Sequence, residues 1–155
     1  MRRQAASVRL VGSSLCVLAA ALLLSACASV PLAAPDVDAR VKTMIPNSQK
    51  ALIYLFRNEM MGALIKFEVS LDGRIVGKTA AKTFLVWEVD PGRHEIASEA
   101  ENTDTLVIHA EAGKTYFVWQ EVKMGGWYAR NKLSLVDDAK GRAGVGECQL
   151  IQGTP

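Results

Sequence analysis

Between residues 51 and 136, short apolar or alternating runs are separated by residues that favour turns, and this pattern constrains the fold more than any other feature of the chain. In residues 65–71 every second side chain is apolar, as expected of a β-strand with one buried and one solvated face. Asp72-Gly73 follows and provides a two-residue hairpin turn, because both positions of such a turn favour positive φ.

Seven other runs have a similar length and composition: residues 51–57, 74–77, 84–89, 94–98, 105–110, 115–122 and 133–136. Turn-forming residues separate several of them, including Asp90-Pro91-Gly92 and Gly125-Gly126. Eight short segments at this spacing predict a β-sandwich or a small barrel, and no segment after residue 50 has the long 3.6-residue period of a helix. About 100 residues suffice for one hydrophobic core, so we expect a single all-β domain over residues 51–155.

The first 26 residues have the three-part plan of an export signal. Three Arg and no acid stand among the first nine residues, residues 15–24 form an apolar core, and small residues follow. A membrane-spanning helix needs roughly 17 to 25 predominantly apolar residues, so this core is too short to be one. The alternative is an uncleaved signal anchor, but Pro31 and Pro35 would break the longer helix that it needs.

Leu24-Ser25-Ala26-Cys27 directly follows the apolar core and resembles the lipobox of bacterial lipoproteins. In such proteins the Cys thiolate accepts a diacylglyceryl group and a peptidase cuts on its N-terminal side. The resemblance implies that residues 1–26 are removed and that Cys27 is lipidated; the alternative is a chance Cys after an ordinary signal. Two or three acyl chains, at about 0.8 kcal/mol per buried methylene, would anchor the chain to membrane lipid. Ala28 replaces the Asp that usually retains Gram-negative lipoproteins in the inner membrane, so we expect the periplasmic face of the outer membrane.

The formal charge of +2 comes from the export signal. From Cys27 onward the chain has 15 basic and 16 acidic residues. A near-neutral body has no basic field to attract phosphates, and we therefore expect no nucleic-acid partner.

Residues 28–50 contain three Pro and no aromatic residue, which is typical of a tether. With the lipidated Cys27 they form the segment 27–50, whose coil dimension would be about 25 to 30 Å if it were fully flexible. Residues 36–45 have apolar side chains at helical spacing behind Pro35, so a short helix that docks on the domain is the alternative.

Cys148 is the only thiol expected in the mature body, since Cys16 leaves with the signal and Cys27 carries lipid. A disulfide within one chain is therefore excluded. Cys148 is interpreted as a small, partly buried apolar side chain. An intermolecular disulfide in an oxidising compartment is the alternative.

Trp127-Tyr128 lies in an expected loop and is followed by Arg130. Two adjacent aromatic side chains beside an Arg could stack on a sugar ring or anchor a protein interface. The alternative interpretation is that they cover the open end of the sandwich.

Motifs for catalysis or metal binding are scarce. His94 and His109 stand on expected strands, and Ser98 occupies the position where a zinc-protease helix beginning at His94 would have its second His. A Ser-His-Asp triad assembled from distant residues stays open, with His94 and His109 as the two His that could supply it. We expect no metal, no cofactor and no catalytic residue.

Two further charged positions have structural interpretations. Arg57 ends the first run before Asn58-Glu59, which indicates a salt bridge. Asp137-Asp138 follows the last run and indicates the start of a short helical turn, because acids are favoured at a helix N-terminus.

Five landmarks in order resemble a bacterial family of unknown function, number 2846, whose members are small lipoproteins similar in plan to PEGA-type β-sandwich modules. They are Ala51–Arg57, Val69-Ser70-Leu71-Asp72-Gly73 with Val76-Gly77, Val89-Asp90-Pro91-Gly92-Arg93-His94, Glu111-Ala112-Gly113-Lys114-Thr115-Tyr116-Phe117, and Leu133-Ser134-Leu135-Val136-Asp137. The resemblance covers roughly residues 36–145. It implies a single antiparallel PEGA-like or immunoglobulin-like β-sandwich of seven to eight short strands, and no activity, so only Cys27 transfers as a functional position.

The sequence thus predicts an envelope lipoprotein whose periplasmic β-sandwich is a non-catalytic binding or assembly module, with an envelope protein or a glycan as its partner. One alternative is binding of carbohydrate or peptidoglycan through the loop that contains Trp127, Tyr128 and Arg130. The other is an envelope hydrolase that uses His94 or His109.

Overall fold

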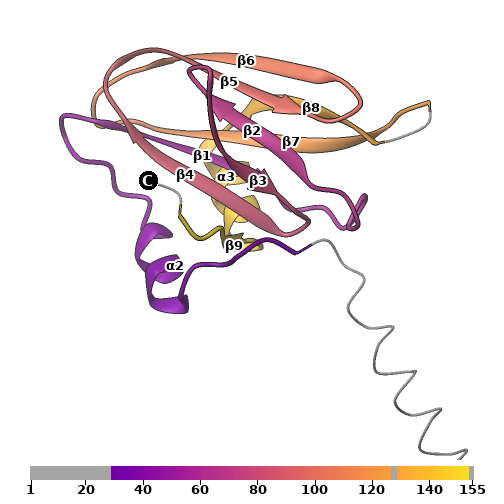
Figure 1. The fold of residues 1–155 in the computed structure, drawn as a ribbon. Coiled ribbons are helices and arrows are strands. Elements are labelled where there is room, and N and C mark those ends of the chain that lie inside the picture. The colour runs from indigo at the N-terminus through magenta and orange to yellow at the C-terminus, as the bar shows by residue number, and fades with distance from the viewer. Residues whose placement is uncertain (1–28, 127–128, 154–155) are drawn as a thin grey trace, which may run out of the picture.

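The computed structural model describes residues 29–126 and 129–153, which form two stacked β-sheets with two short helices (Figure 1). The strands and helices are α2 (Pro35–Val41), β1 (Ala51–Arg57), β2 (Phe67–Leu71), β3 (Arg74–Thr79), β4 (Thr83–Val89), β5 (Gly92–Glu99), β6 (Thr103–Ala110), β7 (Thr115–Met124), β8 (Ala129–Val136), α3 (Asp138–Gly146) and β9 (Gln149–Leu150). Each of the eight predicted runs is a strand, and the predicted all-β sandwich is confirmed.

One sheet has the strand order β8-β7-β1-β4-β9 and the other has the order β3-β2-β5-β6. Most pairs are antiparallel, as expected, but β1 pairs with β7 and β4 pairs with β9 in parallel. These parallel pairs join strands that are distant in sequence. Apolar periodicity does not report strand direction, so sequence alone could not predict them.

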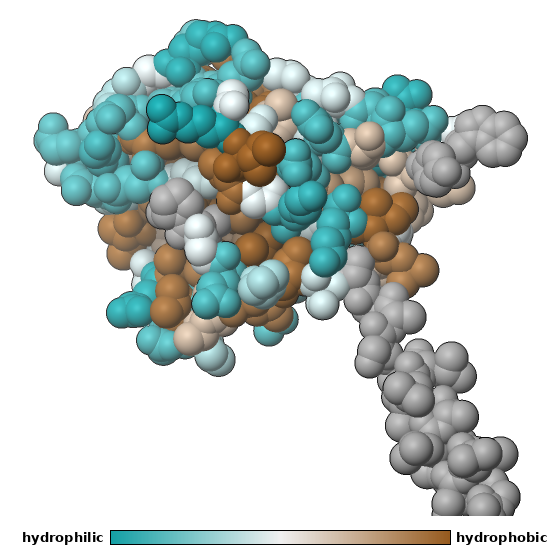
Figure 2. Space-filling model, in the orientation of Figure 1, coloured by the Kyte–Doolittle hydropathy of each residue, from teal (hydrophilic) through white to brown (hydrophobic). Residues whose placement is uncertain are grey.

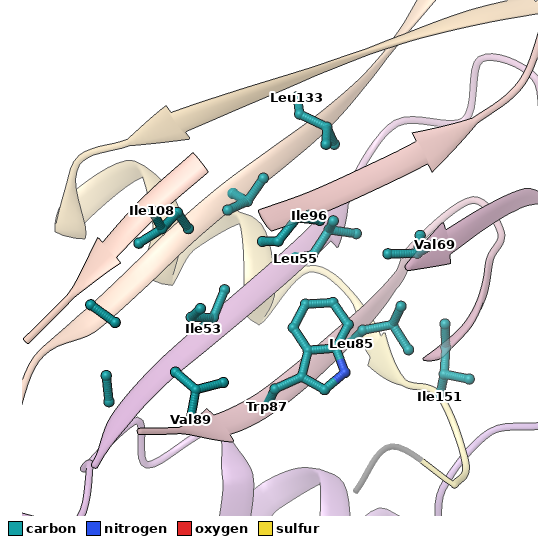
Figure 3. Packing of buried hydrophobic residues seen from close by; sticks show 13 residues of the cluster. Ile53, Leu55, Val69, Leu85, Trp87, Val89, Ile96, Ile108, Leu133 and Ile151 are labelled. Carbon is teal, nitrogen blue, oxygen red and sulfur yellow. The ribbon is translucent and has the colours of Figure 1, made fainter. Parts of the chain in front are cut away.

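The five-stranded sheet is buried on both faces. Its inner face contributes Ile53, Leu55 and Trp87 to the core between the sheets (Figure 3). Its outer face contributes Tyr54 and Phe84 to a second cluster, which the helices cover. Two-sided burial explains why β1 and β4 are almost continuously apolar and do not alternate.

The segment that precedes β1 is docked on the domain along most of its described length. Leu32 forms a β-bridge with Ile151, and the backbone N–H of Ala33 donates to the carbonyl of Leu150 at 2.9 Å. Helix α2 then packs Val37 and Val41 on the outer apolar cluster. A docked helix, and not a fully flexible tether, is the arrangement in the structure.

Helix α3 covers the other part of the same face. Asp137 caps it by accepting a hydrogen bond from the backbone N–H of Lys140 at 2.8 Å, so the start predicted at Asp137-Asp138 is confirmed. Gly141 and Gly144 face the sheet so closely that a Cβ at either position would lie 2.1 Å from a Phe ring atom. The absence of side chains at these two positions allows the helix backbone to lie directly on the aromatic face.

Candidate functional site

Four connections meet at one end of the sandwich: residues 58–66, 80–82, 100–102 and the β7–β8 connection that begins with 125–126. Their common position follows from the register, because Arg57 pairs with Thr83, Phe67 with Thr79 and Glu68 with Glu99. Strand β7 runs parallel to β1 and therefore also finishes here. We call this end, on the right in Figure 1, the loop end.

Arg57 holds the longest of these connections in place. Its side chain is fully buried and donates to the carbonyls of Met61, Gly62 and Ile65 at 3.0, 2.6 and 2.9 Å. The guanidinium also lies 4.6 Å from the ring centroid of Phe67, and desolvation lowers its pKa. The expected salt bridge is wrong, because these hydrogen bonds go to the backbone of the loop.

Beneath the loop end lies a layer of buried polar side chains. Of the residues that the structure describes, six polar or charged ones are buried, and all lie on the strand portions next to this end: Arg57, Thr79, Thr83, Ser98, Gln120 and Asn131. Gln120 joins the two sheets, since its amide accepts from Thr79 Oγ1 at 2.5 Å and donates to Ser98 Oγ at 2.6 Å. Satisfied buried hydrogen bonds of this kind stiffen the platform that carries the loops.

Two open hollows flank the loop end. One, of about 370 Å³, lies between the 58–66 connection and the end of β7, and Met61, Val122 and Met124 are among the residues that line it. The other, of about 540 Å³, adjoins it through Ile65 and Ala129 and has a lining of mixed charge. The hollows therefore combine apolar contact area with a few polar groups, as binding surfaces commonly do.

Large apolar side chains are exposed on the 58–66 connection and at the end of β7. Leu64 is 68 % exposed and Met124 is 84 % exposed, and Met60 and Met61 are more than half exposed. Figure 2 shows hydrophobic surface at this end of the molecule, beside hydrophilic residues. Exposed apolar groups of this kind are a common feature of surfaces that contact other molecules.

The predicted site residues are only partly described. Cys27, Trp127 and Tyr128 lie outside the described residues. Arg130 is exposed on β8, where it pairs with Lys123 of β7, so it borders the loop end. The exposed methionines of residues 58–66 were not predicted, because an apolar side chain in a turn has no periodicity that separates surface from core.

His94 lies at the opposite end of the sandwich with both ring nitrogens engaged. Nδ1 is 2.7 Å from Asp72 Oδ2 and Nε2 is 2.8 Å from the carbonyl oxygen of Asp90. The structure thus brings together the imidazole and the carboxylate of a triad, but the Asp90 carbonyl occupies the position that a nucleophilic hydroxyl needs. Burial, the largest single effect, lowers the pKa of His94, but the bonds to Asp72 and Asp90 together outweigh it and leave the pKa raised.

His109 faces away from His94. His94 pairs with the buried Ile108, whereas His109 pairs with the exposed Arg93, so the two imidazoles lie on opposite faces of the four-stranded sheet. Within residues 29–126 and 129–153 there is no group of three or more His, Cys, Asp or Glu side chains that could hold a metal ion.

Cys148 is buried in the outer apolar cluster and is 2 % exposed. Burial raises the pKa of its thiol to about 12. It occupies the position of a small apolar side chain and is inaccessible to a partner's thiol in the folded domain.

A family model described as "Protein of unknown function (DUF2846)" matches residues 47–131. The chain belongs to this family. The matched segment begins just before β1 and finishes in β8, so it includes all four connections of the loop end. The family resemblance predicted from the five landmarks is confirmed.

A Haemophilus influenzae protein, named only as an uncharacterized protein, is 30 % identical to the DUF2846 chain over 137 residues. The similarity covers 86 % of this chain and 81 % of the relative. It therefore extends beyond the sandwich into the flanking segments. In the part of the chain that the structure describes, neither helix is long and apolar enough to cross a membrane.

Proposed function

We propose that this DUF2846 protein is an envelope lipoprotein, held on the periplasmic face of the outer membrane by lipid on Cys27, and that its β-sandwich is a non-catalytic binding or assembly module. The observation that carries the proposal is Leu24-Ser25-Ala26-Cys27, which stands immediately after a short apolar core with a basic head. Two or three acyl chains make release from a bilayer negligible, so a domain of this size would stay at the membrane.

The fold supports a binding role for the domain. The loop end combines exposed apolar side chains with two hollows and a rigid polar layer beneath them. The imidazole of His94 is occupied by two hydrogen bonds that hold the β2–β3 and β4–β5 turns together, which is a structural role. The geometry therefore favours recognition over chemistry at these positions.

The anchor is tested by replacing Cys27 in the full-length chain. We expect Cys27→Ser to accumulate as an unprocessed precursor that incorporates no labelled palmitate, because the thiol is the acceptor of the lipid. Cys16→Ser is the matched control, since that thiol lies within the signal, and it should be processed and labelled normally. Normal palmitate labelling of Cys27→Ser would refute the assignment.

A further inference from the structure

We infer that the loop end rests on the bilayer surface, with the exposed side chains of Met60, Met61, Leu64 and Met124 inserted among the lipid headgroups. The inference rests on the proposed lipidation of Cys27 and adds to it an orientation and a lipid-contacting surface.

The N-terminal chain reaches the domain at the loop end. Ser29, Val30 and Leu32 line one shallow hollow together with residues 80–83, which connect β3 to β4. Thr83 pairs with Arg57, from which the methionine-bearing connection departs. The first described residues, which begin two positions after Cys27, and the exposed apolar side chains therefore lie at the same end of the sandwich (Figure 1).

The distance to the bilayer is short because the chain is fixed almost from its first described residue. The carbonyl of Pro31 accepts a hydrogen bond from the backbone N–H of Gln152 at 2.8 Å. Cys27 precedes Pro31 by four residues, which extend over at most about 14 Å. The headgroup layer of one leaflet is itself about 5 to 8 Å thick, so a lipidated Cys27 would keep the loop end close to the membrane surface.

The exposed side chains suit that location. Three of the four are methionines, whose unbranched chains adapt to irregular apolar surroundings. The hydrogen bonds of Arg57 to the carbonyls of Met61 and Gly62 fix the loop from within, and Glu59 Oε2 accepts from the backbone N–H of Val122 at 2.8 Å. The apolar side chains are thus presented outward by a loop with fixed geometry.

Charge does not explain the contact. The hollow beside the loop end is lined by Lys66 and Lys78 together with Glu68, Glu99 and Glu101. Mixed charge of this kind gives little attraction to an anionic surface. We therefore expect apolar insertion to dominate and the contact to depend weakly on salt.

The opposite end supplies a control position. Ile45 is 78 % exposed, comparable to Met124, and follows Met44, whose carbonyl accepts a hydrogen bond from Thr115 Oγ1 at the start of β7. It therefore lies near the end of the sandwich that is farthest from the loop end.

The test uses the full chain, processed and lipidated in cells, with a single new cysteine at Leu64→Cys, Met124→Cys or Ile45→Cys. Each protein is labelled with an environment-sensitive fluorophore and reconstituted in phosphatidylethanolamine and phosphatidylglycerol vesicles that contain lipids brominated on their acyl chains. Cys148 stays unlabelled because it is buried in the folded domain. We expect a blue-shifted emission and bromine quenching at positions 64 and 124, unchanged at high salt, and neither effect at position 45.

Three outcomes overturn the inference, and they differ in what they imply for the anchor. If all three proteins float with vesicles but positions 64 and 124 are quenched no more than position 45, the orientation is wrong and the anchor stands. If positions 64 and 124 show no quenching in vesicles, and the same two positions are shielded from water in cells, a protein and not lipid covers the loop end. If the Ile45→Cys protein does not float with vesicles, the lipid anchor itself fails.

Discussion

At the residue scale, Arg57 and His94 show how charged side chains are used at the two ends of the domain. Arg57 is buried and donates hydrogen bonds to three carbonyls of a loop. His94 instead joins two turns, because Asp72 Oδ1 also accepts from the backbone N–H of Glu95 at 2.8 Å. Each side chain adds hydrogen bonds to those that the backbone makes in the same loop or turns.

The His94 contacts predict a pH dependence of stability. The folded-state pKa of His94 is raised, so its contribution is fully present below its unfolded value of 6.5 and is lost as pH rises through the folded value. We expect the free energy of unfolding to fall as pH rises above that unfolded value, and His94→Gln to remove this part of the profile. Urea denaturation at a series of pH values measures the effect.

His109→Gln is the control for that experiment. The side chain of His109 is exposed on the other face of the sheet, so its replacement should leave the pH profile in place. An identical profile for wild type and His94→Gln would contradict the role assigned to the Asp72 and Asp90 contacts.

At the element scale, the strands could be predicted and their partners could not. Residues 51–57 are a strand with the bounds that the sequence indicates, because an apolar run followed by a charged residue is a local signal. Strand β9 was not predicted, since its two residues, Gln149–Leu150, are a strand only by pairing with β4. The salt bridge predicted for Arg57 is wrong, because the partners of this side chain belong to a loop whose path the sequence does not specify.

The contact of α3 with the sheet depends on Gly141 and Gly144. A methyl group at either position would meet a ring, Phe117 or Phe56 respectively, at 2.1 Å. Overpacking of this kind costs about 1–3 kcal/mol or more, which exceeds the gain of at most about 1 kcal/mol that Ala brings over Gly in a helix. We expect Gly141→Ala and Gly144→Ala each to lower the free energy of unfolding, as measured by urea denaturation.

Gly146→Ala provides the matched change in the same helix. A Cβ there would meet nothing within 4 Å, so the helix-propensity gain should dominate and stability should stay equal or rise slightly. Equal destabilisation by all three substitutions would show that contact with the aromatic face does not set the effect.

At the scale of the whole molecule, the two flanks of the sandwich hold each other. Leu32 bridges Ile151, Asp38 Oδ1 accepts from the backbone N–H of Leu150 at 2.7 Å, and Lys42 Nζ donates to the carbonyl of Cys148 at 2.6 Å. The segment expected as a tether is thereby part of the folded unit. This closure is what places the N-terminal chain at the loop end.

Asp38 contributes two contacts to this closure, since it also pairs with Lys42 Nζ at 2.7 Å. Leaving a buried backbone donor unpaired costs about 1–3 kcal/mol, which raises the population with an undocked segment by about fivefold to 150-fold. Because proteolysis tracks that population, we expect Asp38→Ala to speed trypsin cleavage after Arg40 and Lys42 by a similar factor. Asp36→Ala removes only an exposed ion pair at 3.4 Å and should change cleavage far less. Equal cleavage of the two variants would mean that the docking of α2 rests on its apolar contacts alone.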